Sequence, residues 1–264
     1  MILYLNKLKS LSWRIFQPLV EKPSNPYSVV SDLFLWRKGT QLKTYFEAYN
    51  ILPFFEDVNI NKNQSTLIVI FDMAGNNIAE YKFQPNEYGR RTIEITDIVP
   101  KDCGEYGTFS VFHLPSPLVL SSFGCFLAER GYVGYGYNGS DVRSYVHGNL
   151  DALAYSSNNS MEFLGGASFR KRTFNIQHIF SPRDSYELAI VNPTRAMQEI
   201  KIYTLTLKAD CIDCNYIALP PRGAYLFKPK PPEDQYRILL SSFLVMARPL
   251  IFRWQQHNLD VFHA

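Results

Sequence analysis

Side chains that could bind or activate a ligand gather in two segments with a similar order of residue types. The first has an arginine, three tyrosines, an aspartate and a histidine: Arg130, Tyr132, Tyr135, Tyr137, Asp141 and His147. The second has two arginines, a tryptophan, an aspartate and a histidine: Arg248, Arg253, Trp254, Asp260 and His263. Charged groups can orient sugar hydroxyls while an aromatic ring stacks on a pyranose face. We therefore predict that these eleven residues bind a ligand. The alternative is that they pack between sheets, with Arg130 paired to Asp141.

Serine, histidine and aspartate also occur near one another, which raises the question of nucleophilic catalysis. The two sets are Ser121, Ser122, Asp141 and His147, and Ser241, Ser242, Asp260 and His263. A catalytic serine needs an exposed position on a sharp turn beside an oxyanion hole. These serines lie inside predicted strands and no G-x-S-x-G surrounds them. The pattern favours strand structure, and we predict no catalytic residue.

Cysteine spacing gives one further motif, Cys211-Ile-Asp-Cys214. A structural zinc site needs four ligands, and Cys103 and Cys125 are too far apart to form a second knuckle. A redox pair would be expected at the start of a helix. We interpret the pair as incidental, with a metal site or a redox pair as alternatives, and expect neither a metal nor another cofactor.

Charge and composition limit the partners. The net charge is +3, and no sustained basic stretch occurs, so no nucleic-acid partner is expected. No secretory signal precedes the cysteines and no apolar run is long enough to span a membrane, which predicts a cytoplasmic protein. Aromatic residues make up 15% of the chain, an excess that favours β-sheet.

Short β-rich runs separated by turn residues cover most of the chain after Val29. In the first half they are 33–37, 43–49, 66–71, 78–83, 91–97, 107–113 and 119–127. In the second half they are 174–180, 186–191, 199–207, 216–219, 224–228, 236–240 and 250–255. Strands of this length and spacing are typical of sandwiches and barrels.

The halves also show an apparent repeat, because Leu-Ser-Ser-Phe occurs at 120–123 and again at 240–243. Leu67 to Asp72 likewise corresponds to Leu188 to Asn192. We therefore expect an all-β fold of two tandem antiparallel, jelly-roll-like β-sandwich domains. The expected boundaries are an N-terminal helix and Pro-rich linker at 1–27, a first domain at 28–148, a linker at 149–168 and a second domain at 169–264.

Residues 3–19 have the apolar stripe of an amphipathic helix. This helix could pack on the protein's own sheet, pair with another subunit or lie on an anionic membrane surface. Few cations are available for membrane anchoring, so packing on the sheet is the prediction.

The order of segments in the second half resembles the Anabaena sensory rhodopsin transducer family of small β-sandwich proteins. The matching segments are Leu188 to Asn192, Glu199 to Leu205, Leu219 to Phe227, Ile238 to Leu244 and Arg248 to His263. The resemblance implies a sandwich fold, assembly into oligomers, and binding in preference to catalysis.

Three functions remain open. The first is a non-enzymatic protein that binds a carbohydrate or glycan intermediate and forms a homo-oligomer. The second is an adaptor or structural protein in which the repeated segments are protein–protein interface. The third is an enzyme on a β-sandwich that acts on a sugar or nucleotide-sugar.

Overall fold

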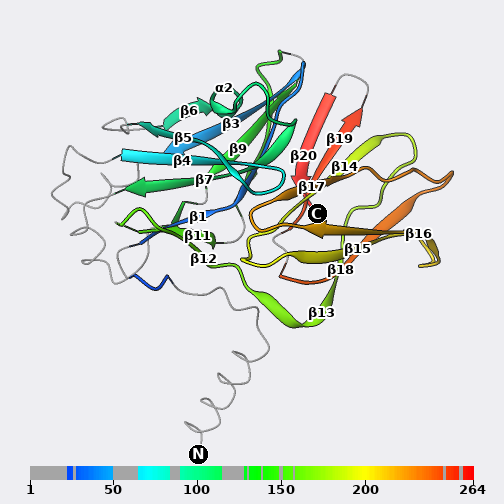
Figure 1. The fold of residues 1–264 in the computed structure, drawn as a ribbon. Helices are drawn as coiled ribbons and strands as arrows, with labels where there is room; N and C mark the ends of the chain where they lie inside the picture. The colour runs from blue at the N-terminus through cyan, green and yellow to red at the C-terminus, as the bar shows by residue number, and fades with distance from the viewer. Residues whose placement is uncertain are drawn as a thin grey trace, which may run out of the picture.

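The structure, a computed structural model, describes residues 23–25, 28–49, 65–83, 90–114, 128–129, 131–137, 139–148, 151–156, 158–245, 248–255 and 258–264. These residues form an all-β fold whose one described helix is the single turn α2 (Ile95–Ile98) (Figure 1). The helix expected at 3–19 lies outside the described residues. None of the helices in the described part is long and apolar enough to cross a membrane.

Strands from the first half of the chain form three four-stranded sheets. The first is β12-β11-β1-β8, with β12 (Met161–Phe163), β11 (Asp151–Tyr155), β1 (Val29–Asp32) and β8 (Ala128–Glu129). The second is β10-β9-β3-β6, with β10 (Arg143–His147), β9 (Tyr132–Tyr137), β3 (Leu42–Tyr49) and β6 (Arg90–Glu94). The third is β2-β7-β4-β5, with β2 (Phe34–Arg37), β7 (Tyr106–Leu114), β4 (Ser65–Asp72) and β5 (Asn77–Phe83).

Strands from the second half form two further four-stranded sheets. One is β13-β18-β15-β16, with β13 (Ala167–Asn175), β18 (Tyr236–Leu244), β15 (Gln198–Thr206) and β16 (Cys211–Leu219). The other is β17-β14-β19-β20, with β17 (Ala224–Phe227), β14 (Ser185–Val191), β19 (Leu250–Gln255) and β20 (Asn258–His263). Among the strands that the structure describes, every pairing is antiparallel except that of β1 with β8.

The expected pair of tandem jelly-roll sandwiches is wrong. The five small sheets are arranged in the manner of a five-bladed β-propeller. Propellers are typically built from four-stranded blades, and every sheet here has four strands. Each sheet nevertheless takes strands from separated parts of the chain, so sequence order alone does not reveal the arrangement.

Packing gives the physical reason for this correction. Ile202 and Leu240 of β13-β18-β15-β16 share a core with Leu188 and Ile251 of β17-β14-β19-β20. The other face of β17-β14-β19-β20 is also buried, because Ala189, Ala224, Phe252 and Val261 belong to the core that contains Trp36, Phe46 and Tyr135 of the first half. A sheet buried on both faces cannot be one wall of an independent sandwich.

A buried ion pair lies where the halves meet. Arg37 of β2 binds Glu187 of β14, and these side chains are only 8% and 7% exposed. The Arg37 guanidinium lies over the rings of Phe252 and Trp254, at 5.0 and 5.6 Å from their centroids. Lys228 reaches the other oxygen of Glu187 at 2.8 Å. The two halves are therefore joined by charge as well as by apolar packing.

Two turns also interlock across the halves. The β4–β5 turn contains Gly75, whose φ of +81° is in the left-handed region. A Cβ at this position would collide with the carbonyl oxygen of Pro221 in the turn before β17. The backbone N–H of Ala224 donates to the carbonyl of Met73 at 3.1 Å. Glycine is therefore required at residue 75 both by its conformation and by the approaching backbone.

The tandem repeat is also wrong at the level of strand pairing. The segments compared as equivalent lie on β4 and β14. β4 pairs with its hairpin neighbour β5 and with β7, whereas β14 pairs with β17 and β19. The first Leu-Ser-Ser-Phe copy, at 120–123, lies outside the described residues. The second lies on β18, where Ser242 donates its hydroxyl to the carbonyl of Glu199 at 2.8 Å. This hydroxyl therefore bonds to the neighbouring strand, as expected for a serine inside a strand.

Most individual strand predictions are confirmed within a residue or two, because alternation and turn residues identify strands locally. Two differ in kind. Residues 95–98 of the expected strand 91–97 form α2, and residues 151–163 of the expected linker contain β11 and β12. β11 pairs with β1 near the start of the chain. The linker residues thus complete a sheet of the first half.

Candidate functional site

The first predicted segment forms the β9–β10 hairpin. Tyr135 is only 1% exposed and donates its hydroxyl to the carbonyl of Leu35 at 2.9 Å. Its ring packs edge-on against that of Phe252, with the two ring centroids 4.9 Å apart. Burial raises the pKa of its hydroxyl well above the ordinary value. Tyr132 is exposed, Tyr137 is half-buried and Asp141 lies exposed in the turn. Arg130 lies outside the described residues, so its pairing with Asp141 stays a prediction.

The second predicted segment forms the β19–β20 hairpin. Arg253 and Asp260 are directly opposite each other and form an ion pair. The pKa of Arg253 is raised by its hydrogen bond to that carboxylate. Trp254 stacks on Phe252 with centroids 5.9 Å apart. The partners described for these three residues are therefore within the protein and stabilise the hairpin.

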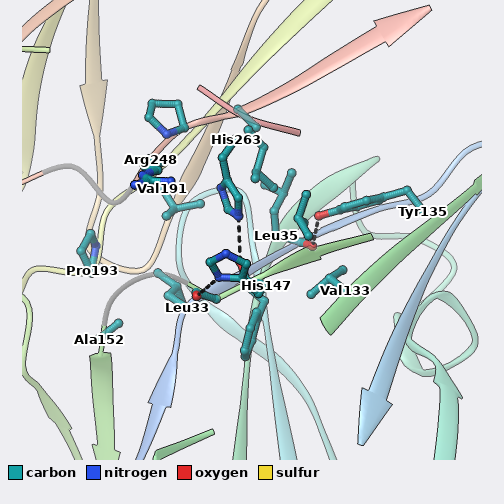
Figure 2. A pocket seen from close by; sticks show the side chains of 16 residues that line it. Leu33, Leu35, Val133, Tyr135, His147, Ala152, Val191, Pro193, Arg248 and His263 are labelled. Carbon is teal, nitrogen blue, oxygen red and sulfur yellow. Dashed lines mark hydrogen bonds between the residues drawn. The ribbon is translucent and has the colours of Figure 1, made fainter. Parts of the chain in front are cut away.

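The two segments meet along β10 and β20. The Ser144 hydroxyl donates to the carbonyl of Leu259 at 3.2 Å and accepts from the N–H of Val261 at 3.1 Å. The rings of His147 and His263 lie 4.9 Å apart, and Nε2 of His263 is 3.1 Å from the carbonyl oxygen of His147. These two rings and Arg248 line a narrow cavity, and Figure 2 shows the ring of His263 next to that of His147. The structure thus brings together His147, Arg248 and His263 of the predicted residues.

The narrow cavity has a volume of about 50 Å³ and extends between the halves toward Leu35, Tyr135 and Ala152. This volume is enough for water but far below the roughly 300 Å³ of the smallest typical ligand pockets. We therefore do not assign a ligand to this cavity.

A larger cleft of about 390 Å³ lies on the other side of Arg248 and His263. Eight residues line it: Phe174, Asn175, Gln177, His178, Arg248, Phe262, His263 and Ala264. Its volume is within the range of small-molecule sites. Asn175 ends β13, while the final strand β20 supplies Phe262 and His263. We define these eight residues as the Arg248 cleft.

Both imidazoles of the cleft have a lowered pKa. Burial lowers the pKa of His263 first, followed by the neighbouring His147, and hydrogen bonds to backbone carbonyls oppose the shift. Burial also lowers the pKa of His178, followed by the charge of Arg253, with Asp184 opposing. Both rings are therefore mainly neutral at pH 7, and a neutral imidazole offers one donor and one acceptor.

Three polar residues of the cleft, Asn175, Gln177 and His178, were missed from the sequence. Asn175 and Gln177 are two residues apart, the spacing that places side chains on one face of an extended chain. His178 packs among aromatic rings, and its ring centroid is 4.9 Å from that of Phe180 and 5.0 Å from that of Phe262. Only the fold shows that this segment faces Arg248, because the two are about seventy residues apart.

The remaining motifs are the cysteine pair and a buried histidine cluster. Among the described residues, no group of three or more His, Cys, Asp or Glu side chains is placed to hold a metal ion. Cys211 and Cys214 are free, exposed thiols on β16. A second cluster is buried, where His113 binds Glu129 and its Nδ1 is 3.3 Å from the Thr66 hydroxyl. Thr66 is only 1% exposed, so a substrate cannot reach its hydroxyl in this structure.

Comparison with known proteins does not identify the chain. No family model matches it. No curated protein matches it either. Among solved structures, one that it resembles weakly is a glycosyl hydrolase family 2 member from Bacteroides cellulosilyticus. The identity is 9% and the TM-score is 0.15, and the match covers 95% of this chain but 30% of that one. The chain spans less than a third of that protein's length, and a TM-score this low carries no argument about fold or function.

Proposed function

We propose that this chain is a non-enzymatic protein that binds a carbohydrate in the Arg248 cleft. The observation that supports the proposal most is the set of groups in one cleft of about 390 Å³: an arginine, two amides, two imidazoles and two phenylalanine rings. Protein sites for small ligands combine apolar surface with a few convergent polar groups in this way.

The chemistry of these groups suits an oxygen-rich ligand. The Arg248 guanidinium supplies several donors in a fixed plane, and the amides of Asn175 and Gln177 each supply donors and an acceptor. The rings of Phe174 and Phe262 are half-buried and offer apolar surface for the face of a pyranose. Such a site can satisfy ring hydroxyls in either hydrogen-bonding role.

The same residues favour binding over hydrolysis. Glycoside hydrolysis ordinarily requires two carboxyl groups, one on each side of the scissile bond. None of the eight side chains lining the cleft is a carboxylate, a thiol or a hydroxyl. This composition supports a binding site in preference to an enzyme acting on a sugar.

A glycan and nucleotide-sugar array tests the proposal, with the wild-type protein compared with Arg248→Ala and Gln177→Ala. Arg170→Ala is the matched control, because Arg170 is an exposed arginine on β13 outside the cleft. We expect a subset of glycans to bind wild type and Arg170→Ala and to be lost with both cleft variants. Absence of wild-type binding, or binding that survives Arg248→Ala, would contradict the proposal.

The interface alternative concerns the exposed part of the β9–β10 hairpin. Homo-oligomer formation also stays a prediction. Tyr132→Ala with Asp141→Ala removes two exposed side chains without entering the core. Sedimentation velocity that shows dissociation of an oligomer by this variant, with glycan binding retained, would support an adaptor or structural role for that hairpin.

We further propose a cytoplasmic location, supported by the three free cysteines of the described residues, Cys103, Cys211 and Cys214. Labelling with a thiol reagent in intact cells and lysates tests this, since disulfide-linked cysteines would resist the reagent.

A further inference from the structure

The outer face of the sheet β13-β18-β15-β16 (Figure 1) carries exposed rings and cations that the proposed function does not use. Along β15 and β18, alternate residues such as Ile200, Ile202 and Leu240 are buried in the core. The residues between them point to the opposite side of the sheet, because side chains alternate along a strand. All residues of this sheet lie within 158–245, a range that the structure describes without a gap.

Strand register places the outward residues in rows. One row contains Thr173, Ser241, Lys201 and Tyr216, and the next contains Asn175, Leu239, Tyr203 and Cys214. Phe243 and Arg237 also point outward, because each is an even number of residues from Ser241 along β18. Neighbouring strands are separated by about 4.8 Å, so β18 and β16 are roughly 10 Å apart across the sheet. Phe243 is two residues along β18 from the row of Tyr216, which adds an offset of roughly 7 Å along the strands.

Exposed aromatic rings on this face are accompanied by cations. Tyr216 is 67% exposed and Phe243 is 40% exposed. The ammonium of Lys201 lies 4.6 Å from the ring centroid of Tyr216, and that of Lys171 lies 5.7 Å from that of Phe243. The pKa of Lys201 is raised by its interaction with the Tyr216 hydroxyl, which keeps it charged. Each ring thus has a positive charge beside it.

The charge of the face is positive. Three cations point outward, Lys171 on β13, Arg237 on β18 and Lys201 on β15. They are opposed by one carboxylate, that of Glu199 on β15. Exposed rings flanked by cations suit a polyanion whose units have flat faces.

We propose that this face binds single-stranded nucleic acid. Bases stack on exposed aromatic side chains and the phosphates are held by lysine and arginine in sequence-tolerant binding sites. Four-stranded sheets that present aromatic rings can bind two or three bases in this way. An acidic polysaccharide or an acidic peptide would use the cations but would not require both rings.

The sequence did not predict this surface, since it contains no sustained basic stretch. Lys171, Lys201 and Arg237 are about thirty residues apart from one to the next. They come to share one face of a sheet only because β18 lies between β13 and β15. The proposal therefore departs from the expectation that no nucleic acid binds. Its rings and cations lie outside the Arg248 cleft, and Asn175 is the one residue named in both surfaces.

Fluorescence anisotropy with a labelled oligothymidylate of about 12 nucleotides, within the known range of site sizes, tests the proposal. The variants are Tyr216→Ala/Phe243→Ala and Lys201→Gln. The control is Tyr81→Ala, which removes an exposed tyrosine on β5 of a different sheet. Circular dichroism checks the fold of each variant, and Tyr216→Ser replaces the double variant if that variant unfolds.

We expect wild type and Tyr81→Ala to bind equally. Loss of each ring should weaken binding about tenfold. Lys201→Gln should reduce the slope of log affinity against log salt by about 0.7. Three results would each overturn the proposal. The wild type could fail to bind the oligonucleotide at low salt, or Tyr216→Ala/Phe243→Ala could bind it as tightly as wild type. Heparin could also displace the oligonucleotide equally well from wild type and from the ring variant.

Discussion

The buried ion pair between Arg37 and Glu187 offers a direct test of how the two halves pack. Arg37→Met leaves the Glu187 carboxylate buried beside Lys228 alone, whose side chain is 72% exposed. Removing one partner of a buried pair typically costs about 3–5 kcal/mol. Because Lys228 still compensates part of the charge, we expect a loss near the lower end, about 3 kcal/mol.

The double variant Arg37→Met/Glu187→Met separates charge from packing. Replacing a whole buried pair by apolar residues of similar volume is often neutral or stabilising, so we expect the double variant to recover to within about 1 kcal/mol of wild type. Urea unfolding followed by tryptophan fluorescence and by circular dichroism measures these differences. The fluorescence should respond directly, because Trp254 lies under the Arg37 guanidinium.

A surface ion pair provides the control. Lys43 binds Glu94 at 2.6 Å, but its side chain is 55% exposed. Lys43→Met should leave the unfolding midpoint unchanged within error, since exposed pairs contribute little. If Arg37→Met were equally harmless, or if the effects of Arg37→Met and Glu187→Met were simply additive, the reasoning that places the two halves against each other would be refuted.

Two further predictions concern the junction and the cleft. Gly75→Ala should lower the free energy of unfolding by more than about 1 kcal/mol, because the added Cβ meets the Pro221 carbonyl oxygen. Gly139 also has a positive φ, but a Cβ there would meet no atom, so Gly139→Ala should cost only about 1 kcal/mol in thermal unfolding. Because His178 and His263 have folded-state pKa values below the ordinary 6.5, the unfolded chain binds protons first as the pH falls. The free energy of unfolding should therefore be highest above pH 6.5 and should decrease as the pH falls below that value. His178→Gln should make this pH dependence weaker, as measured by urea unfolding at a series of pH values. A free energy of unfolding that increases as the pH falls below 6.5 would contradict the lowered pKa values of these two histidines.

Local features of the sequence predicted the strands but not their partners. The alternation around Lys201 and the turn at Gly75 identified β15 and the β4–β5 hairpin, since both depend on neighbouring residues. Sheet membership depends on contacts far apart in the chain, and β11 joining β1 has no local signature. The apparent repeat misled the prediction because β4 and β14 have similar sequences but different partners.

The predicted binding residues show the same limit. The arginine, aspartate and histidine pattern located one end of the cleft through Arg248 and His263. It also included Tyr135, which the core buries, and Arg253 and Asp260, which pair with each other. Residue type shows which groups can bind a ligand, whereas burial decides which of them can reach one.

The measurement that tests the central claim most directly is a nuclear magnetic resonance titration of the histidine rings with a glycan that binds on the array. The chain has five histidines, and the buried His113 serves as an internal control. We predict that the ring signals of His178 and His263 shift with saturation while those of His113 do not. A glycan that binds without moving either cleft histidine would show that the Arg248 cleft is not the binding site.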